Sequence, residues 1–108
     1  MTSEKENSIN MGIKQQVLDE IREMAKKYQI KKVILFGSRA RGDYQETSDI
    51  DLATEGGNHV RFALDIDDFT STLLKYDIIN LDGSVQGDLR KSIEREGIVI
   101  YEEAGGIN

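Results

Sequence analysis

A short apolar run, Val33 to Phe36, ends directly at the pair Gly37-Ser38. A continuous apolar run of this length that stops at a glycine is typical of a strand buried on both faces. Glycine allows the backbone to turn tightly there and to approach a ligand closely. The sequence therefore predicts a buried strand that leads into a sharp polar turn.

Ten residues separate Ser38 from a second patterned segment, Asp49 to Ala53, in which acidic and apolar residues alternate. This period of two predicts a strand with Asp49 and Asp51 on one face and Ile50 and Leu52 on the other. Two carboxylates spaced in this way lie ~6.6 Å apart along an extended strand, so they can share one metal ion or straddle two. Their hard oxygen atoms suit Mg²⁺.

Helical and strand patterns account for most of the remaining chain. Helices are expected at 12–29, 58–75 and 88–96, and further strands at 76–81 and 98–101. The second helix is predicted to carry an apolar stripe, formed by Phe62, Ile66, Phe69 and Leu73. This order predicts an α/β (α+β) fold in which a small mixed sheet has its helices mainly on one face.

Length and composition restrict the organisation and the function class. The 108 residues suit one domain, expected at 11–103, between flexible tails at 1–10 and 104–108. There is no apolar stretch of about 20 residues for a membrane span, so a cytoplasmic location is the default expectation. The net charge of −6 argues against a broad nucleic-acid-binding surface, because such surfaces depend on lysine and arginine.

The turn after the first strand is a candidate phosphate site. Gly37 brings backbone N–H groups close to a ligand, and Ser38 adds a hydroxyl to this anion-binding concavity. Arg39 and Arg41 follow at once and add positive charge. Gly37, Ser38, Arg39 and Arg41 are therefore the expected nucleotide-binding residues.

A third carboxylate is expected to complete the metal site. Asp77 interrupts the apolar run formed by Tyr76, Ile78 and Ile79, and a buried carboxylate without a cation or hydrogen bonds is costly. The structural alternative is a strand-edge aspartate bonded to backbone, and Asp82 is the alternative ligand. We accordingly expect Asp49, Asp51 and Asp77 to be the metal-binding and catalytic residues.

Each of these features is common by itself, since Gly-Ser is an ordinary turn and Asp-x-Asp occurs on solvated strand ends. The combination is rarer: the chance of finding Gly37, Ser38, Asp49 and Asp51 at this spacing is on the order of 10⁻³ over the chain. Other acidic and basic groups have simpler interpretations. His59 has no second histidine or cysteine beside it, and Asp65, Asp67 and Asp68 suit a solvated helix face.

The segments 34–42 and 48–53 together resemble the signature of the DNA polymerase β-type nucleotidyltransferase superfamily, and more narrowly of the prokaryotic minimal nucleotidyltransferases. The resemblance continues through 76–81 and 96–101. It implies that Asp49 and Asp51 hold two Mg²⁺ ions, that Asp77 holds the catalytic one, and that Gly37 with Ser38 grips the triphosphate of ATP.

The resemblance also implies a partner. Such proteins are often encoded beside a small helical protein, either a HEPN-type toxin ribonuclease or a helical substrate-binding subunit. In the toxin systems the nucleotidyltransferase is the antitoxin and adenylylates a hydroxyl of the toxin. Two alternatives stay open: a non-catalytic module that neutralises a helical partner by steric contact, and a small-molecule nucleotidyltransferase with its substrate-binding subunit in trans.

Overall fold

The computed structural model describes residues 12–104. The tail expected at 1–10, and the tail expected at 104–108 except for Ala104, therefore lie outside the described residues. The described chain runs through four helices and four strands: α2 (Gln15–Lys27), β1 (Lys32–Phe36), α3 (Ser38–Arg41), β2 (Ile50–Glu55), α4 (His59–Phe69), β3 (Tyr76–Asn80), α5 (Gly87–Glu96) and β4 (Ile98–Glu102). Between residues 12 and 104, no helix has the length and apolar character needed to cross a membrane.

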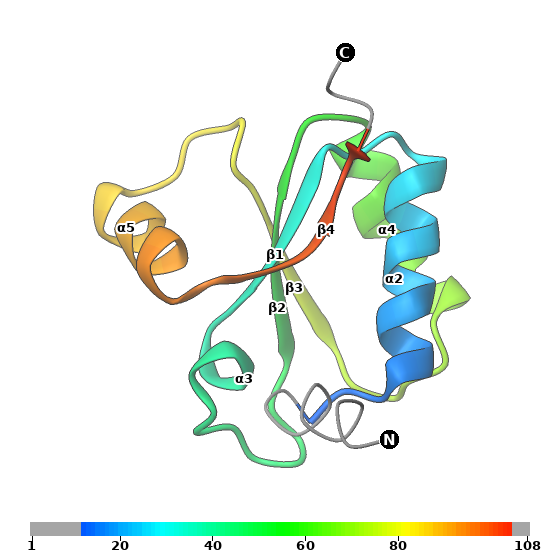
Figure 1. The fold of residues 1–108 in the computed structure, drawn as a ribbon, viewed down its shortest axis with the longest axis horizontal. Helices are drawn as coiled ribbons and strands as arrows, with labels where there is room; N and C mark the ends of the chain where they lie inside the picture. Colours follow the sequence, from blue (N-terminus) through cyan, green and yellow to red (C-terminus); the bar gives the residue numbers. More distant parts are fainter. Residues whose placement is uncertain (1–11, 105–108) are drawn as a thin grey trace.

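The four strands form one mixed sheet in the order β3-β2-β1-β4. β1 is antiparallel to both of its neighbours, whereas β2 and β3 are parallel. A parallel pair needs a crossover between its strands, and α4 provides it. Figure 1 shows α2 and α4 together against one side of the sheet and α5 on the opposite side. The predicted small mixed sheet with helices mainly on one face is confirmed, and the helices on that face are the two longest, α2 and α4.

The main core lies between the sheet and the α2–α4 layer. Val33 and Leu35 of β1 are fully buried there, together with Ile21 of α2 and Phe62 of α4. The prediction that β1 is buried on both faces was wrong, because the remaining β1 residues are only partly buried. On that second face α5 packs against β1, and the β1 side chains there keep part of their surface exposed, so this face is more open than the first.

The helix predicted at 58–75 is shorter than expected. Asn58 caps it as predicted, since its side-chain oxygen accepts a hydrogen bond from the N–H of Arg61 at 3.2 Å. The helix ends at Phe69, after which Thr70 is extended and its hydroxyl donates to the carbonyl of Ile66 at 2.8 Å. Leu73, predicted to lie in the apolar stripe, is fully exposed. The chain leaves the helix early because it has to return to the sheet and begin β3.

Candidate active site

Two of the three predicted catalytic carboxylates lie on adjacent strands. Asp51 on β2 is the register partner of Asp77 on the parallel strand β3. Directly opposed residues project from the same face, and neighbouring strands are ~4.8 Å apart, so both carboxylates lie on the open side of the sheet. Asp49 lies just before β2 and is exposed. Asp77 is also exposed, so the expectation that it is a buried carboxylate was wrong.

The electrostatics of this end of the sheet centre on Asp51. The pKa of the Asp51 carboxyl is raised to about 6, chiefly by burial and then by the negative charges of Asp77 and Asp49, against a smaller opposing effect of Arg41 and Arg39. A carboxylate that resists ionisation because it is partly buried and faces two other carboxylates is typical of a site that is completed by a cation.

Gly37 closes the site on its third side. Its neighbour Phe36 is the register partner of Asp51 across β1 and β2, so the turn begins beside that carboxylate. Gly37 has a φ of 75°, and a Cβ built on it would collide with Oδ2 of Asp51. Only glycine satisfies both constraints, because L residues rarely adopt this backbone conformation and any side chain would displace the carboxylate.

The turn continues into a short helix that the sequence did not predict. α3 is a single turn, and the N–H groups of Ala40 and Arg41 both donate to the carbonyl of Gly37 at 3.1 Å. Gly42 ends it in a left-handed conformation. Four residues are too few for a periodic pattern, which is why hydrophobic periodicity gave no signal for this element. Ser38, the first residue of α3, therefore lies next to Gly37 at the end of β1.

Arg39 is not placed as the sequence suggested. It is only 1% exposed, and its guanidinium donates to backbone carbonyls of two separate segments, Gly12 and the loop 45–48. The acceptors are the carbonyls of Gly12 (3.2 Å), Gln45 (3.4 Å), Glu46 (3.1 Å) and Ser48 (2.9 and 3.1 Å). Its Cζ also lies 4.8 Å from the ring centre of Tyr44. These contacts orient the guanidinium toward the loop that follows α3.

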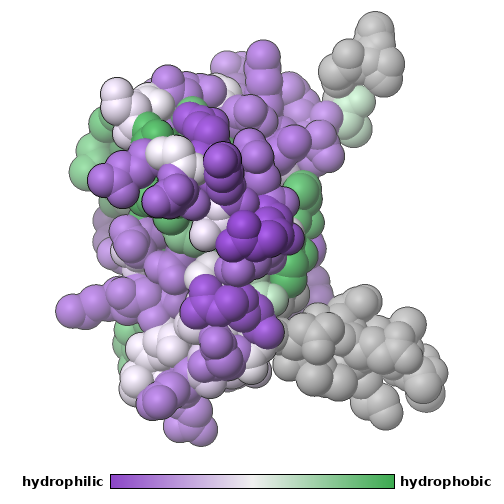
Figure 2. All heavy atoms as spheres, turned by 90° about the vertical axis from the view of Figure 1, so that its left-hand side faces the viewer, coloured by the Kyte–Doolittle hydropathy of each residue, from purple (hydrophilic) through white to green (hydrophobic). Residues whose placement is uncertain are grey.

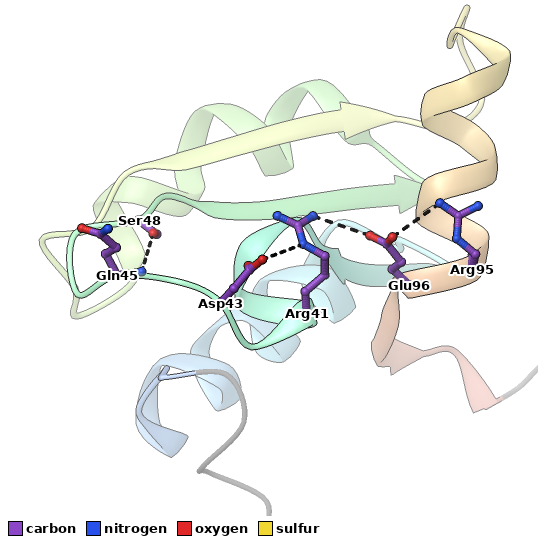
Figure 3. A network of polar contacts seen from close by, with 6 residues as sticks. All are labelled: Arg41, Asp43, Gln45, Ser48, Arg95 and Glu96. Carbon is purple, nitrogen blue, oxygen red and sulfur yellow. Dashed lines mark hydrogen bonds and ion pairs between the residues drawn. The ribbon is translucent and has the colours of Figure 1, made fainter.

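Arg41 is the exposed arginine of α3 and takes part in an ion-pair network (Figure 3). Its Nε lies 3.2 Å from Asp43, and its Nη1 lies 3.5 Å from Glu96, at the end of α5. Arg95 contacts the other oxygen of Glu96 at 3.4 Å. Asp43 and Glu96 had no predicted role, and the pair with Glu96 has no sequence signal, because residues 41 and 96 approach each other only in the folded chain.

The remaining residues considered in the sequence lie away from the carboxylates. Asp82, the alternative metal ligand, accepts a hydrogen bond from the N–H of Gly56 at 2.7 Å and so holds the turn after β2. His59 has its Nδ1 2.7 Å from the hydroxyl of Thr54, and burial lowers the pKa of its ring. Both groups are therefore explained by local structure.

The carboxylates fit a divalent cation by their chemistry more than by their present spacing. Within the part of the chain that the structure describes, no three His, Cys, Asp or Glu side chains converge into a ready-made metal site. The donors are nevertheless hard carboxylate oxygens, and their mutual repulsion is what a bound cation would relieve. Such a set suits Mg²⁺ that takes its other ligands from phosphate oxygens and water.

The surface around the site is largely polar. Figure 2 looks at the side of the molecule that carries α5 and shows mainly hydrophilic residues, with small apolar patches between them. An open, polar surface of this kind suits a charged ligand that stays partly in contact with water. It differs from the deep apolar pocket that encloses a drug-sized ligand.

Comparison with known proteins agrees with this geometry. A protein of Methanocaldococcus jannaschii named as a putative protein adenylyltransferase is 36% identical over 81 residues, which cover 67% of this chain and 79% of the relative. A second relative from the same organism, with the same description, is 32% identical over 83 residues, covering 73% of this chain and 85% of its own.

Solved structures show the same fold. A crystal structure of a toxin–antitoxin with AMP-PNP matches with a TM-score of 0.66 at 18% identity, over 82% of this chain and 75% of that one. A structure described as a putative minimal nucleotidyltransferase matches with a TM-score of 0.59 at 28% identity, over 75% and 86% of the two chains. The family model described as "Polymerase beta, Nucleotidyltransferase" matches residues 19–105. The chain therefore belongs to the polymerase beta nucleotidyltransferase family and is a transferase.

Proposed function

We propose that this protein transfers AMP from ATP to a hydroxyl group of a partner protein, with Mg²⁺ held by Asp49, Asp51 and Asp77. The observation that carries the proposal is the placement of Asp51. It is the register partner of Asp77 on β3, and Gly37 at the end of β1 packs against its carboxylate. Metal-binding carboxylates and a turn that can approach phosphates therefore meet at one end of the sheet.

The turn and its helix provide the nucleotide contacts in this proposal. Gly37 leaves room for phosphate oxygens to approach the backbone, and the Ser38 hydroxyl can donate a hydrogen bond to them. Arg41 is exposed at the same edge and carries the positive charge that a triphosphate requires. To bind phosphate, Arg41 would have to give up its ion pairs with Asp43 and Glu96. This costs little free energy, because exposed ion pairs are weak. Arg39, by contrast, is buried, and in this proposal it supports the nucleotide site indirectly, by holding the loop 43–49.

The reaction is an in-line displacement at the α-phosphorus of ATP. The acceptor oxygen forms a bond to this phosphorus, the bond to the bridging oxygen breaks, and pyrophosphate leaves. The Asp77 carboxylate, exposed beside Asp51, is placed to accept the proton of the acceptor hydroxyl. Mg²⁺, when bound, supplies neutralisation of the charge that develops on the attacking and leaving oxygens.

The choice of a protein acceptor rests on the relatives. The curated relatives are named as protein adenylyltransferases, and a fold neighbour is a toxin–antitoxin crystallised with AMP-PNP. We extend this to the present chain and propose a helical partner, of which a HEPN-type toxin is the leading candidate. In that case the chain acts as the antitoxin and inactivates the toxin by adenylylation.

Calorimetric titration tests the nucleotide site. A non-hydrolysable ATP analogue is titrated into the wild type and Asp51→Asn, with and without Mg²⁺, and Asp82→Asn serves as the matched control. The control removes a carboxylate of the same type that lies outside the site and whose amide oxygen can still accept from Gly56. We expect Mg²⁺-dependent binding in the wild type and the control, and a loss of at least about tenfold in Asp51→Asn. Equal binding in all three proteins would overturn the assignment.

Transfer itself is tested with a HEPN-type helical protein, the proposed partner, as the acceptor. After incubation with ATP and Mg²⁺, intact-mass analysis should show the helical protein heavier by one adenylyl group or more, and peptide mapping should place it on a hydroxyl. A complex that forms without any mass increase would instead support the non-catalytic module. The absence of both complex and modification would leave the small-molecule transferase as the better proposal.

A further inference from the structure

Arg39 connects two parts of the site that are separated in the sequence. It directly follows Ser38 in α3, and its guanidinium donates to the carbonyl of Ser48, the residue directly before Asp49, at 2.9 and 3.1 Å. One buried side chain therefore joins the residue after the phosphate-binding turn to the residue before the first carboxylate. The connection does not require Arg39 to touch a ligand.

The same guanidinium fixes the shape of the loop between these points. It also donates to the carbonyls of Gln45 and Glu46, and the loop closes on itself through a hydrogen bond from the Gln45 N–H to the Ser48 hydroxyl at 2.8 Å. The Tyr44 ring packs against the guanidinium, with its centre 4.8 Å from Cζ of Arg39. Because the loop has no regular secondary structure between residues 43 and 49, these contacts define its conformation.

We propose that Arg39 is a positioning residue, which sets Asp49 relative to the Gly37–Ser38 turn so that both can act on one Mg²⁺-bound triphosphate. The function depends on the planar, multidentate geometry of the guanidinium and not on its charge. Lysine keeps the charge but presents a single ammonium group, which cannot reach carbonyls of several residues in one plane. A direct phosphate contact would have the opposite dependence, because lysine also binds phosphate.

The inference rests on the proposed nucleotidyl transfer, and its test begins with two variants and one control. Arg39→Lys keeps the charge and removes the fork, while Ser48→Ala removes the hydrogen bond that closes the loop and leaves Arg39 intact. Ile21→Ala, at a fully buried position of α2, is the control for general destabilisation. All proteins are compared at a temperature at which circular dichroism shows them to be folded.

Hydrogen exchange of the ligand-free protein is the first readout. We expect amides of residues 43–50 to exchange at least about tenfold faster in Arg39→Lys, with β1 and β4 unchanged, and a smaller effect in the same direction in Ser48→Ala. The control should accelerate exchange throughout. Unchanged exchange at 43–50 in Arg39→Lys would overturn the inference, and this readout is independent of whether the protein binds ATP.

Calorimetry with the ATP analogue is the second readout. We expect both Arg39→Lys and Ser48→Ala to lose most of the affinity that the wild type gains on adding Mg²⁺, with little change in Mg²⁺-free binding. The loss of binding free energy in the double variant should be less than the sum of the two single losses, because both substitutions act through one loop. Full affinity in Arg39→Lys together with a loss in Arg39→Gln would show a charge contact with phosphate and overturn the inference. A wild type that shows no Mg²⁺-dependent binding would count against the proposed function, while the exchange data would still decide the role of Arg39.

Discussion

Asp51 and Asp77 are directly opposed on two parallel strands, although 25 residues and a helix separate them in the chain. Asp51 also packs against Gly37, at the end of the strand on its other side. The central strand β2 thus receives a ligand-approach turn from β1 and a second carboxylate from β3. This arrangement concentrates negative charge at one end of the sheet, and several consequences can be measured.

Asp51→Asn should abolish most activity and stabilise the metal-free protein at neutral pH. The folded-state pKa of Asp51 is raised to about 6, so the folded state favours its protonated form. Protonation of Asp51 therefore contributes to the free energy of unfolding of the wild type. This contribution is fully present below the unfolded pKa and is lost as the pH rises through about 6. After a discount for solvent screening, we expect a gain of about 1 to 2 kcal/mol in the variant at neutral pH.

Urea unfolding of the two metal-free proteins between about pH 4 and pH 7 measures this difference. The two stabilities should converge at the acidic end and separate toward pH 7, with the variant higher. Addition of Mg²⁺ and ATP analogue should then stabilise only the wild type, because a ligand stabilises the state that binds it. A variant that is less stable than the wild type at every pH would contradict the raised pKa of Asp51 and the unfavourable burial and charge repulsion that cause it.

Gly37→Ala should impair nucleotide binding more than Gly42→Ala does. Both glycines have positive φ values, 75° and 95°, so alanine strains the backbone at each. The strain is about 1 to 2 kcal/mol at Gly42, which is left-handed, and about 1 to 3 kcal/mol at Gly37, whose ψ of −156° lies in a region that essentially only glycine adopts. At Gly42 no atom lies within 4 Å of the added Cβ, whereas at Gly37 the Cβ collides with the Asp51 carboxylate. Titration of the ATP analogue should show a loss confined to Gly37→Ala, and equal losses would mean that the Gly37–Asp51 contact has no functional weight.

Glu96→Gln should raise the affinity for ATP slightly. Glu96 is one of two carboxylates that hold Arg41, and its neutral analogue competes less with phosphate for the guanidinium. The expected gain is about two- to threefold, consistent with the ~0.2 to 1 kcal/mol of an exposed ion pair. Glu94→Gln, which neutralises an exposed glutamate of the same helix, is the control for the change in net charge. A loss of affinity specific to Glu96→Gln would indicate that the ion pair orients Arg41 productively.

Leu73→Ser should leave the stability almost unchanged, within about 0.5 kcal/mol, because the Leu73 side chain is fully exposed. Ile66→Ser, in the same predicted stripe, should cost several kcal/mol, because it puts an unsatisfied hydroxyl and a cavity at a buried position. Denaturation midpoints of the two variants provide the measurement. A large loss in Leu73→Ser would mean that this segment packs against the core, as the sequence pattern suggested.

The sequence was most informative where a local pattern matches a local structure. The alternation after Asp49 predicted β2 and the common face of its apolar residues, and Asn58 predicted the start of α4. It failed at the end of α4, where Leu73 continues the helical spacing but the chain leaves the helix. Periodicity reports which face a residue would take in a helix, whereas the return of the chain to β3 decides where that helix ends.

The same division applies to the site. The sequence by itself determined the fold class and which carboxylates and which turn are available, because strand alternation and the Gly37 position follow from local backbone chemistry. Only the tertiary structure decided their arrangement: the parallel register that opposes Asp51 and Asp77, the exposure of Asp77, and the burial of Arg39 among backbone carbonyls. Two arginines separated by one residue look alike in a sequence, but in the folded α3 the Arg39 side chain points into the loop and Arg41 lies at the surface.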